Sequence, residues 1–383
     1  RRTSASRIMG SLRIPACFMR GGSSKGVFFS RSDLPPNQTV WDRFFLSVIG
    51  SPDPYGRQLN GMGGGVSSLS KVAVISPSER NDADLDFTFG QVAVGDALVD
   101  YSSNCGNLSS AVGPFALERG LIRLADGERS VRIYNTNTKK LLIAHFTVED
   151  GLAVETGDFT IPGVAGSGAP VRLEFLDPAG AGTGHLLPTG NLTDEIRTDD
   201  GRSFDATLMD VGNPCVFIDA ATVGRTANET ITELESDRPL MALLDQVRRK
   251  AAVMMGLAGD EASAPAAVPK IAIVGAPQVA QDLAGDMIAP DMADLSVRML
   301  SMGNVHRVLP LTGAMCTGVA CRLPGTVPAA LAKAPDGDVR LANPSGILPV
   351  GANVTAGDPP EVRSVTVIRT ARLLMNGEVA IPI

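Results

Sequence analysis

The most distinctive chemistry-bearing segment is residues 61–71, GMGGGVSSLSK, which leads into the apolar run VAVI. A loop rich in glycine and serine can aim backbone N–H groups at an anion. The segment is not a Walker-type phosphate loop, because that motif needs Gly-Lys followed by Ser or Thr, whereas Lys71 follows Ser70 and precedes Val72. What remains is a single amine, with no carboxylate close to it in the sequence, where a loop meets a buried strand.

Two further segments combine a polar turn with an apolar helix. NCGN (104–107) precedes a helix predicted over 108–119, and SMGNVHR (301–307) precedes a helix predicted over 311–321. Both helices are apolar or small almost all round, which is typical of a helix buried on all sides. A buried helix N-terminus carries unpaired N–H groups and about half a positive charge. Two such ends facing each other would form a cleft suited to a small polycarboxylate.

Short apolar runs bounded by turn residues predict a fold rich in β-strands. One segment, 239–257, has the periodicity of an amphipathic helix, with Asp237 as its expected N-cap, and we expect it to form an outer layer over a sheet. The clearest strand candidates are VRIYNTN (131–137), LLIAHFTV (141–148), VRLEFL (171–176), CVFIDA (215–220), KIAIVG (270–275) and SVTVIRTARLL (364–374).

The length and charge of the chain limit its organisation and its partners. A chain of 383 residues is long enough for two domains of ordinary size, and the polar segment 188–205 is the expected crossover between them. Hydrophobic residues make up 44% and charged residues 20%, as in globular proteins. The formal net charge of −7 argues against nucleic acid or an anionic membrane as partner, so an anionic substrate needs a local positive site.

The cysteines and the apolar stretches indicate the compartment. Five cysteines are widely spaced without a C-x-x-C pair, which argues against a disulfide framework or a structural zinc site. Residues 1–11 lack the apolar core of a secretory signal. No apolar stretch approaches the roughly 18 residues that a membrane-spanning helix needs. We therefore expect a soluble, cytoplasmic protein with free thiols.

Several blocks of the sequence resemble the PrpF family of isomerases, and together they span most of the chain. The blocks are RIPACFMRGGSSKGVFF (13–29), GSPDPYGRQLNGMGG (50–64), SSLSKVAVI (67–75), NCGN (104–107), FLDPAGAGTGHLLPTGN (175–191) and ADLSVRMLSMGNVHR (293–307). The resemblance implies an isomerase that needs no cofactor and no metal and acts on 2-methylaconitate, aconitate or a related unsaturated carboxylate.

A more distant resemblance indicates the fold. NCGN and VGNPC (211–215) are similar to motifs of diaminopimelate epimerase. This implies an α+β fold of two similar β-barrel-like halves, each around a buried central helix. The expected first domain spans 12–187 with the C-terminal strand 364–383, and the second spans 188–363. The active site is expected in the cleft between them.

The resemblance assigns the chemistry to Lys71 and Cys105. Moving a proton on carbon beside a conjugated carboxylate needs a base with a pKa near 7 and a way to stabilise the dienolate. A free lysine has a pKa near 10.4, and an apolar site poor in carboxylates lowers such a value. A helix N-terminus likewise lowers the pKa of a cysteine that precedes it. We predict that Lys71 removes the allylic proton and that Cys105 or Lys71 returns one.

A wider set of residues is expected to bind the substrate through charges, hydroxyls and backbone N–H groups. In this set Lys25 would act as a fixed positive charge rather than as a titrating base. The expected substrate is a small anionic carboxylate, and a homodimer is the default assembly. The candidates are Arg20, Gly22, Ser23, Ser24, Lys25, Ser67, Ser68, Ser70, Asn104, Gly106, Asn107, Ser301, Gly303, His306 and Thr312.

Three alternative functions remain open at this point. One is an oxalomesaconate-type isomerase that shifts a double bond. Another is an amino-acid epimerase with two catalytic cysteines, in which Cys316 is the second. The third is a non-enzymatic protein that binds tricarboxylates. We expect Cys316 to serve packing, since it lies about one turn inside its predicted helix.

Overall fold

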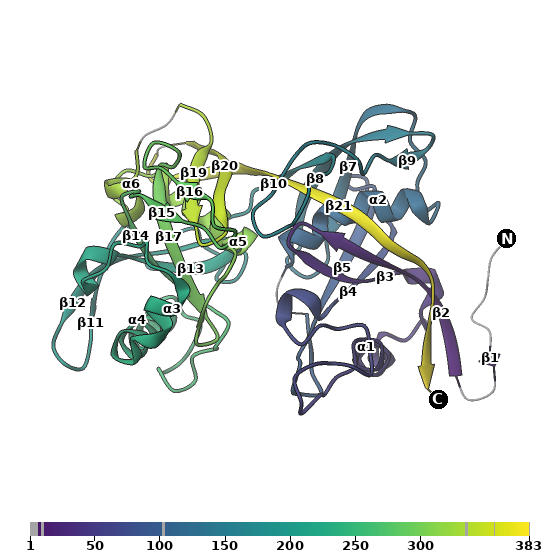
Figure 1. The fold of residues 1–383 in the computed structure, drawn as a ribbon, viewed down its shortest axis with the longest axis horizontal. Coiled ribbons are helices and arrows are strands. Elements are labelled where there is room, and N and C mark those ends of the chain that lie inside the picture. The colour runs from purple at the N-terminus through teal and green to yellow at the C-terminus, as the bar shows by residue number, and fades with distance from the viewer. Residues whose placement is uncertain (1–6, 9–10, 102–103, 334–335, 356, 383) are drawn as a thin grey trace. The chain divides into compact units, whose positions relative to one another are not determined.

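The computed structural model describes residues 7–8, 11–101, 104–333, 336–355 and 357–382. The chain divides into two compact units: unit 1 is 1–174 with 368–383, and unit 2 is 175–367. Strand β21 (Glu361–Pro382) contributes residues to both (Figure 1). No helix among the described residues has the length and apolar character required to cross a bilayer.

The boundary between the units lies earlier than the expected 187/188. The segment after β10 (Pro170–Leu176) is fixed to unit 2 through Asp210, which is fully buried. Its carboxylate accepts hydrogen bonds from the backbone N–H groups of Gly182 and Thr183 at 2.8 and 2.6 Å. These contacts explain why the loop belongs to unit 2, and they join residues too distant in sequence for a local pattern to reveal.

Unit 1 is a closed sheet around a helix. Its strands pair in a ring that begins at β2 and returns to it through β21. Short strands β1 (Arg7–Ile8), β6 (Val99–Asp100) and β9 (Leu152–Ala153) extend this sheet. The order of the ring is β2 (Ser11–Gly21), β3 (Ser24–Ser30), β4 (Lys71–Pro77), β5 (Leu85–Val92), β7 (Gly127–Asn135), β8 (Lys140–Glu149), β10 and β21.

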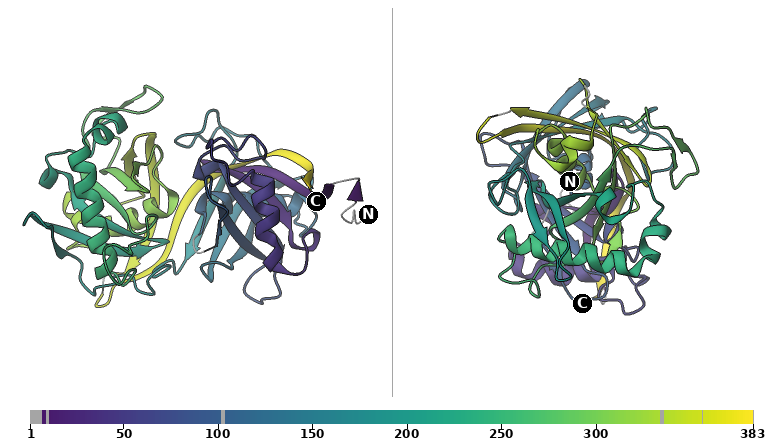
Figure 2. Two further views of the ribbon diagram at one scale, coloured as in Figure 1. Left: turned by 90° about the horizontal axis from the view of Figure 1, so that it is seen from below. Right: turned by 90° about the vertical axis from the view of Figure 1, so that its left-hand side faces the viewer.

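Helix α2 (Gly106–Glu118) is buried on all sides inside unit 1, as its lack of a polar face predicts. It begins two residues earlier than expected. Small residues let the sheet approach closely: a Cβ at Gly113 would come within 2.5 Å of the Phe146 ring. Helix α1 (Trp41–Ile49) covers the other face of the sheet, and its Trp41 and Phe45 join the apolar cluster there (Figure 2).

Unit 2 follows the same plan. Helix α5 (Leu311–Cys321) is almost wholly buried, and α4 (Arg238–Met254) packs on the opposite face of the sheet as an outer layer (Figure 2). Asp237 caps α4, as predicted, by accepting a hydrogen bond from the Leu240 N–H at 3.0 Å. The sheet comprises β11 (Asp194–Arg197), β12 (Ser203–Val211), β13 (Asn213–Asp219), β14 (Lys270–Gly275), β17 (Leu295–Ser301), β18 (Asn304–Val305), β19 (Val339–Asn343), β20 (Gly346–Thr355) and the start of β21.

The remaining elements are short and connect the sheets to their helices. In unit 2 they are α3 (Ile231–Ser236), α6 (Val327–Leu331) and the separate two-stranded sheet of β15 (Ala280–Gln281) and β16 (Met287–Ile288). The 3-10 turns are η1 (Arg31–Asp33), η2 (Gln38–Val40), η3 (Ser67–Leu69) and η4 (Ala220–Val223).

The two units repeat one pairing scheme. In unit 1, β2, β3, β4, β5, β7 and β8 pair successively in antiparallel, parallel, antiparallel, parallel and antiparallel senses. In unit 2, β12, β13, β14, β17, β19 and β20 repeat that series. The predicted α+β fold of two similar halves, each around a buried central helix, is confirmed.

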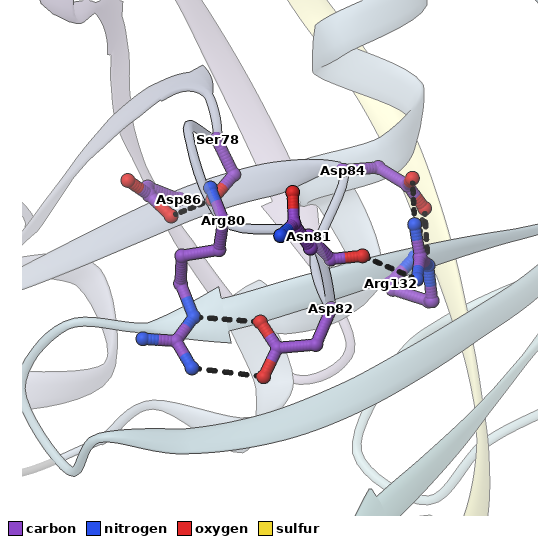
Figure 3. Close-up of polar contacts among 7 residues, drawn as sticks. All are labelled: Ser78, Arg80, Asn81, Asp82, Asp84, Asp86 and Arg132. Atoms are coloured by element: carbon purple, nitrogen blue, oxygen red, sulfur yellow. Dashed lines mark hydrogen bonds and ion pairs between the residues drawn. The ribbon is translucent and has the colours of Figure 1, made fainter.

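Hydrogen bonds and ion pairs between side chains stabilise the turn of the β4–β5 hairpin, residues 78–84 (Figure 3). Side-chain contacts hold this turn within itself, across to Asp86 and to β7, and the pairing of β4 with β5 places Lys71 opposite Gln91 at the other end of the hairpin. The contacts at the turn are Arg80–Asp82 and Arg132–Asp84 at 2.8 Å and Ser78–Asp86 at 2.6 Å.

Candidate active site

Lys71 is the first residue of β4, and its side chain is only 8% exposed. The parallel neighbour in β3 is Gly26, where a Cβ would come within 2.6 Å of the Lys71 carbonyl oxygen. Glycine is therefore required for this close approach. Val72 and Val74 point into the cluster under α1, so Lys71 lies on the opposite face, toward α2.

The contacts of the Lys71 amine are neutral. Its Nζ donates a hydrogen bond to Gln91 Oε1 at 2.6 Å and lies 4.8 Å from the centre of the Phe89 ring. Among the described residues, no carboxylate forms a hydrogen bond or an ion pair with this amine. The amine thus contacts no acidic side chain of the described residues, just as it has no acidic residue near it in the sequence. It is held by an amide oxygen and by the face of an aromatic ring.

Gln91 in turn is fixed by the glycine- and serine-rich segment. Its Nε2 donates to the carbonyl oxygens of Ser67 and Ser70, each at 3.0 Å. An amide rotated by 180° would place oxygen against oxygen at both carbonyls, so Oε1 must face Lys71. The segment therefore contributes to the site through its backbone.

The serines of that segment have different surroundings. Ser70 is fully buried, and its hydroxyl contacts Gln58 Oε1 at 2.7 Å and the Val66 carbonyl at 2.8 Å. These contacts hold the loop together. Ser67 is exposed and Ser68 half-buried, so their hydroxyls remain candidates for binding the substrate.

Cys105 is the N-cap residue of α2 and is 7% exposed. Its carbonyl accepts from the Ser109 N–H at 3.2 Å, while no side chain caps the helix. The first turn of α2 contains no acidic residue, so the positive end of the helix dipole is not neutralised within that turn. Asn104 is held from β7, where Asn135 Nδ2 donates to its Oδ1 at 2.6 Å.

The α2 N-terminus and Lys71 lie on the same face and at the same end of the sheet. A Cβ at Gly21 would come within 2.6 Å of the Asn107 carbonyl, so this end of β2 touches the first turn of α2. Gly21 pairs with Ser24, two residues from Gly26, the neighbour of Lys71. The fold thus brings the amine to the end of the sheet where α2 begins.

A buried guanidinium adds positive charge beside α2. Arg369 is 5% exposed, and its Nε donates to Asn107 Oδ1 at 3.0 Å. Burial lowers the pKa of Arg369 to about 10, which still leaves it charged at neutral pH. Asn107 Nδ2 also donates to Ser23 Oγ at 3.2 Å. The close approach requires Gly22, where a Cβ would lie 2.2 Å from Asn107 Oδ1.

The other candidates of the β2–β3 turn are less closely tied to this group. Arg20 Nη1 donates to the carbonyls of Gly22 and Thr370, both at 3.0 Å, so much of its hydrogen bonding holds the turn. Ser24 is buried. Lys25 is half-buried, with its Nζ 5.5 Å from the centre of the Phe18 ring.

The candidates in unit 2 form a group of their own. Ser301 Oγ lies 2.7 Å from His306 Nε2. Burial, with a smaller contribution from the charge of Lys270, lowers the pKa of His306 to about 3. Thr312 lies in the first turn of α5 and accepts from Asn213 Nδ2 at 2.7 Å. Gly303 forms the exposed turn between β17 and β18 with φ +77°.

Cys316 is fully buried in the middle of α5. Burial, together with the neighbouring Cys215 thiol, raises the pKa of Cys316 well above its usual value. Burial also raises the pKa of Cys17 to about 11 and that of Cys321 to about 12. These environments favour the packing role expected for Cys316 and oppose thiolate chemistry there.

Sequence reasoning missed Gln91 and Arg369. Gln91 reaches Lys71 only through the β4–β5 pairing, and Arg369 reaches Asn107 across 262 residues. A signal was present for Gln91, since both strands and their turn are visible in the sequence. No local pattern distinguishes Arg369 from the other arginines of its strand.

Comparison with known proteins agrees with this architecture. Residues 11–382 match the PrpF protein family. The 3-methylitaconate isomerase of Eubacterium barkeri is 42% identical over 96% of this chain and 97% of its own. The 2-methyl-aconitate isomerase of Shewanella oneidensis is 40% identical over 97% of each chain, and the 4-oxalomesaconate tautomerase of Pseudomonas putida is 38% identical over 97% of each.

A solved structure extends the likeness to three dimensions. The crystal structure of a methylitaconate-delta-isomerase superposes with a TM-score of 0.86, at 41% identity, over 97% of this chain and 96% of that one. The fold and these full-length relatives define the protein as an isomerase. The chain belongs to the PrpF family.

Proposed function

We propose that this isomerase acts on a small unsaturated di- or tricarboxylate of the 2-methylaconitate or aconitate type. The observation that carries the proposal is the buried amine of Lys71, which has neutral contacts and lies at the end of the sheet where α2 begins. Relatives at 40–42% identity that are named for 2-methylaconitate and 3-methylitaconate support the substrate class.

In the proposed reaction, the unprotonated amine of Lys71 takes a proton from the carbon next to the double bond. The electron pair left on that carbon delocalises through the double bond toward a carboxylate and gives a dienolate. The positive end of α2 and the Arg369 guanidinium oppose the new negative charge. Among the described residues, the contacts of the Lys71 amine are the Gln91 amide oxygen and the Phe89 ring, and neither is a carboxylate.

Return of a proton completes the reaction in one of two ways. Rotation about the loosened bond followed by protonation of the original carbon gives the cis–trans isomer. Protonation at the far end of the allylic system shifts the double bond. The Cys105 thiol is the proposed donor, and the Lys71 ammonium returns the proton itself where both steps use one face. The proton on Lys71 and the thiolate at Cys105 then re-equilibrate through solvent.

The substrate carboxylates are proposed to bind near the first turn of α2. Arg369 and Lys25 supply positive charge, and Ser23 and Asn107 supply hydrogen bonds. Exposed Ser67 and half-buried Ser68 are the serines of the glycine-rich segment best placed to add hydroxyl contacts. This local positive site is what a chain with a net charge of −7 requires for an anionic substrate.

The alternatives differ in how well the observations support them. An oxalomesaconate-type shift of a double bond uses the same base, and a relative at 38% identity is a 4-oxalomesaconate tautomerase. A two-cysteine epimerase is disfavoured because Cys316 is fully buried and its pKa is raised. A protein that only binds tricarboxylates does not fit a chain whose full-length relatives are isomerases.

Proton NMR in deuterium oxide separates the substrates and tests the base. The purified chain is incubated with cis-aconitate, 2-methylaconitate or oxalomesaconate, and isomerisation and loss of the allylic proton signal are followed together. We expect turnover with the first or second compound. Lys71→Met should lower the rate of turnover and the rate of allylic proton exchange with solvent by several orders of magnitude. Its melting temperature should stay close to that of the wild type. Near-normal activity in this variant would remove the mechanism.

A further inference from the structure

Gln58 is a polar residue buried in the loop that leads to Lys71. It is 1% exposed, and its φ of +55° is a left-handed backbone conformation that is unfavourable for a residue other than glycine. The Gln58 N–H donates to Asp53 Oδ2 at 2.5 Å. The same carboxylate accepts from the N–H groups of Tyr55 and Arg57 at 2.9 and 3.0 Å. Asp53 thus stabilises the turn that directs the Gln58 side chain inward.

The amide of Gln58 joins the beginning of this loop to its end. Its Oε1 accepts from the Gly65 N–H at 2.8 Å and lies 2.7 Å from the Ser70 hydroxyl. Its Nε2 donates to Ser51 Oγ at 2.8 Å. An amide rotated by 180° would place Nε2 against the Gly65 N–H, so Oε1 must face Gly65. A Cβ at Gly63 would come within 2.2 Å of Oε1, so glycine is required there for the loop to close around the amide.

Ser70 is held by two glutamine side chains at once. Its hydroxyl contacts Gln58, and its carbonyl accepts from Gln91 Nε2 at 3.0 Å. The same carbonyl accepts from the Val92 N–H at 2.9 Å, which fixes the end of the loop to β5. Lys71 follows Ser70 directly, and its Nζ donates to Gln91 Oε1. The path of contacts from Gln58 to the amine therefore passes through Ser70 and Gln91, all within unit 1.

The orientation of the Gln91 amide decides which atom meets the Lys71 amine. With Oε1 facing it, Gln91 accepts one N–H of the amine and leaves the nitrogen lone pair free to take a proton. A rotated amide would present Nε2, a donor, and would occupy that lone pair. The two acceptors that prevent this rotation, the carbonyls of Ser67 and Ser70, lie at the start of η3 and directly after it. Gln58 holds this turn through Ser70.

We propose that Gln58 is a positioning residue for the reaction. It holds the Ser70 carbonyl in place, the carbonyl holds the Gln91 amide, and the amide leaves the lone pair of Lys71 to the substrate. This inference deepens the proposed function and rests on it, since it requires Lys71 to be the base. Because Gln58 acts through Ser70 and Gln91, its loss should change the rate of the chemical step more than the binding of the substrate.

The first measurement needs no substrate. Hydrogen–deuterium exchange followed by mass spectrometry compares the wild type with Gln58→Met and with the control Gln38→Met, which makes the same substitution at an exposed glutamine of η2. In Gln58→Met, the amides of 61–71 and of Val92 should exchange about tenfold faster or more, because the Ser70 carbonyl is no longer fixed. Exchange in unit 2, and throughout the control, should stay within about twofold of the wild type.

The second measurement is a double-mutant cycle on kcat. Gln58→Met should lower kcat about tenfold or more, with KM within about threefold of the wild type. Gln58→Met combined with Gln91→Met should lower kcat much less than the product of the two single effects, because both substitutions act on the same contact with Lys71. If Gln58→Met does not fold, Ser70→Ala takes its place in both measurements, since it removes the hydroxyl and keeps the carbonyl.

Two results would overturn the role of Gln58. One is unchanged exchange of 61–71 and Val92 in Gln58→Met. The other is a double variant in which the two effects on kcat multiply, because a general loss of folded protein acts independently of the Gln91 amide. Failure of the proposed function is distinguishable: the wild type would turn over none of the unsaturated acids, yet the exchange measurement would still show whether Gln58 holds the loop.

Discussion

Lys71 Nζ and Gln91 Oε1 lie 2.6 Å apart across the β4–β5 pair, and only one orientation of the Gln91 amide permits this contact. The amide nitrogen is committed to the carbonyls of Ser67 and Ser70. Gln91 therefore connects the glycine- and serine-rich segment to the amine at its end. In the proposed mechanism Gln91 would act on the reaction only through Lys71, so the role proposed for Gln91 is to position that amine.

Replacing Gln91 tests this role. In Gln91→Glu, a carboxylate beside the amine favours the ammonium form, so the acid limb of the pH–rate profile should move to higher pH and kcat at pH 7 should fall at least about tenfold. In Gln91→Met, the contact is lost without a new charge, so kcat should fall while the acid limb shifts little. Equal profiles for the wild type and Gln91→Glu would contradict the assignment.

Arg369 gives a second prediction, on substrate binding. Arg369→Lys keeps the charge but loses the planar fork that bonds Asn107. We expect KM to rise about tenfold or more because the fork that orients the carboxylate is lost, with a smaller change in kcat because lysine keeps the positive charge that is proposed to oppose the dienolate. Arg372→Lys, on an exposed residue of the same strand, is the control and should leave KM unchanged. Steady-state kinetics with thermal melting of each variant provides the check.

The sequence predicts the parts of the fold that local patterns encode. Helices α2 and α5 follow from their lack of a polar face, and the burial of Lys71 agrees with its place at the start of an apolar strand. The sequence does not show which side a loop residue faces. Ser70 resembles Ser67 in the motif, yet its hydroxyl is turned inward to Gln58 because the loop folds around that side chain.

Long-range contacts set the rest of the candidate site. Gln91 enters the site through the β4–β5 pairing, and Arg369 enters it through the return of β21. Only the pairing of two strands connects Gln91 to Lys71, and no local pattern distinguishes Arg369. Lys270 begins β14 as Lys71 begins β4, and the sequences that flank the two lysines differ, so only the strand pairing reveals that their positions are equivalent.

The two candidate cysteines give a third prediction. Cys105→Ala should lower kcat by a factor of about 100 or more, because the proposed proton donor at the α2 N-cap is lost. Cys316→Ala should leave kcat within about threefold and lower the melting temperature, since the side chain is wholly buried in α5. The reverse pattern, with activity lost only in Cys316→Ala, would revive the two-cysteine epimerase.

The low pKa of His306 predicts that the free energy of unfolding decreases as the pH falls below about 6.5. The folded pKa of about 3 lies below the usual value near 6.5, so the unfolded chain binds a proton that the folded chain excludes. The contribution of His306 is therefore constant above pH 6.5 and becomes destabilising as pH falls from 6.5 toward 3. Between pH 7 and 5 this single group can cost up to about 2 kcal/mol.

The prediction is tested by comparing the wild type with His306→Gln, whose side chain does not titrate. Urea unfolding of both proteins at pH 7, 6 and 5 gives the free energy of unfolding at each pH. The wild type should lose more stability than the variant as the pH falls, and the difference should grow mainly below pH 6.5. Parallel curves for the two proteins would mean that His306 can be protonated in the folded chain.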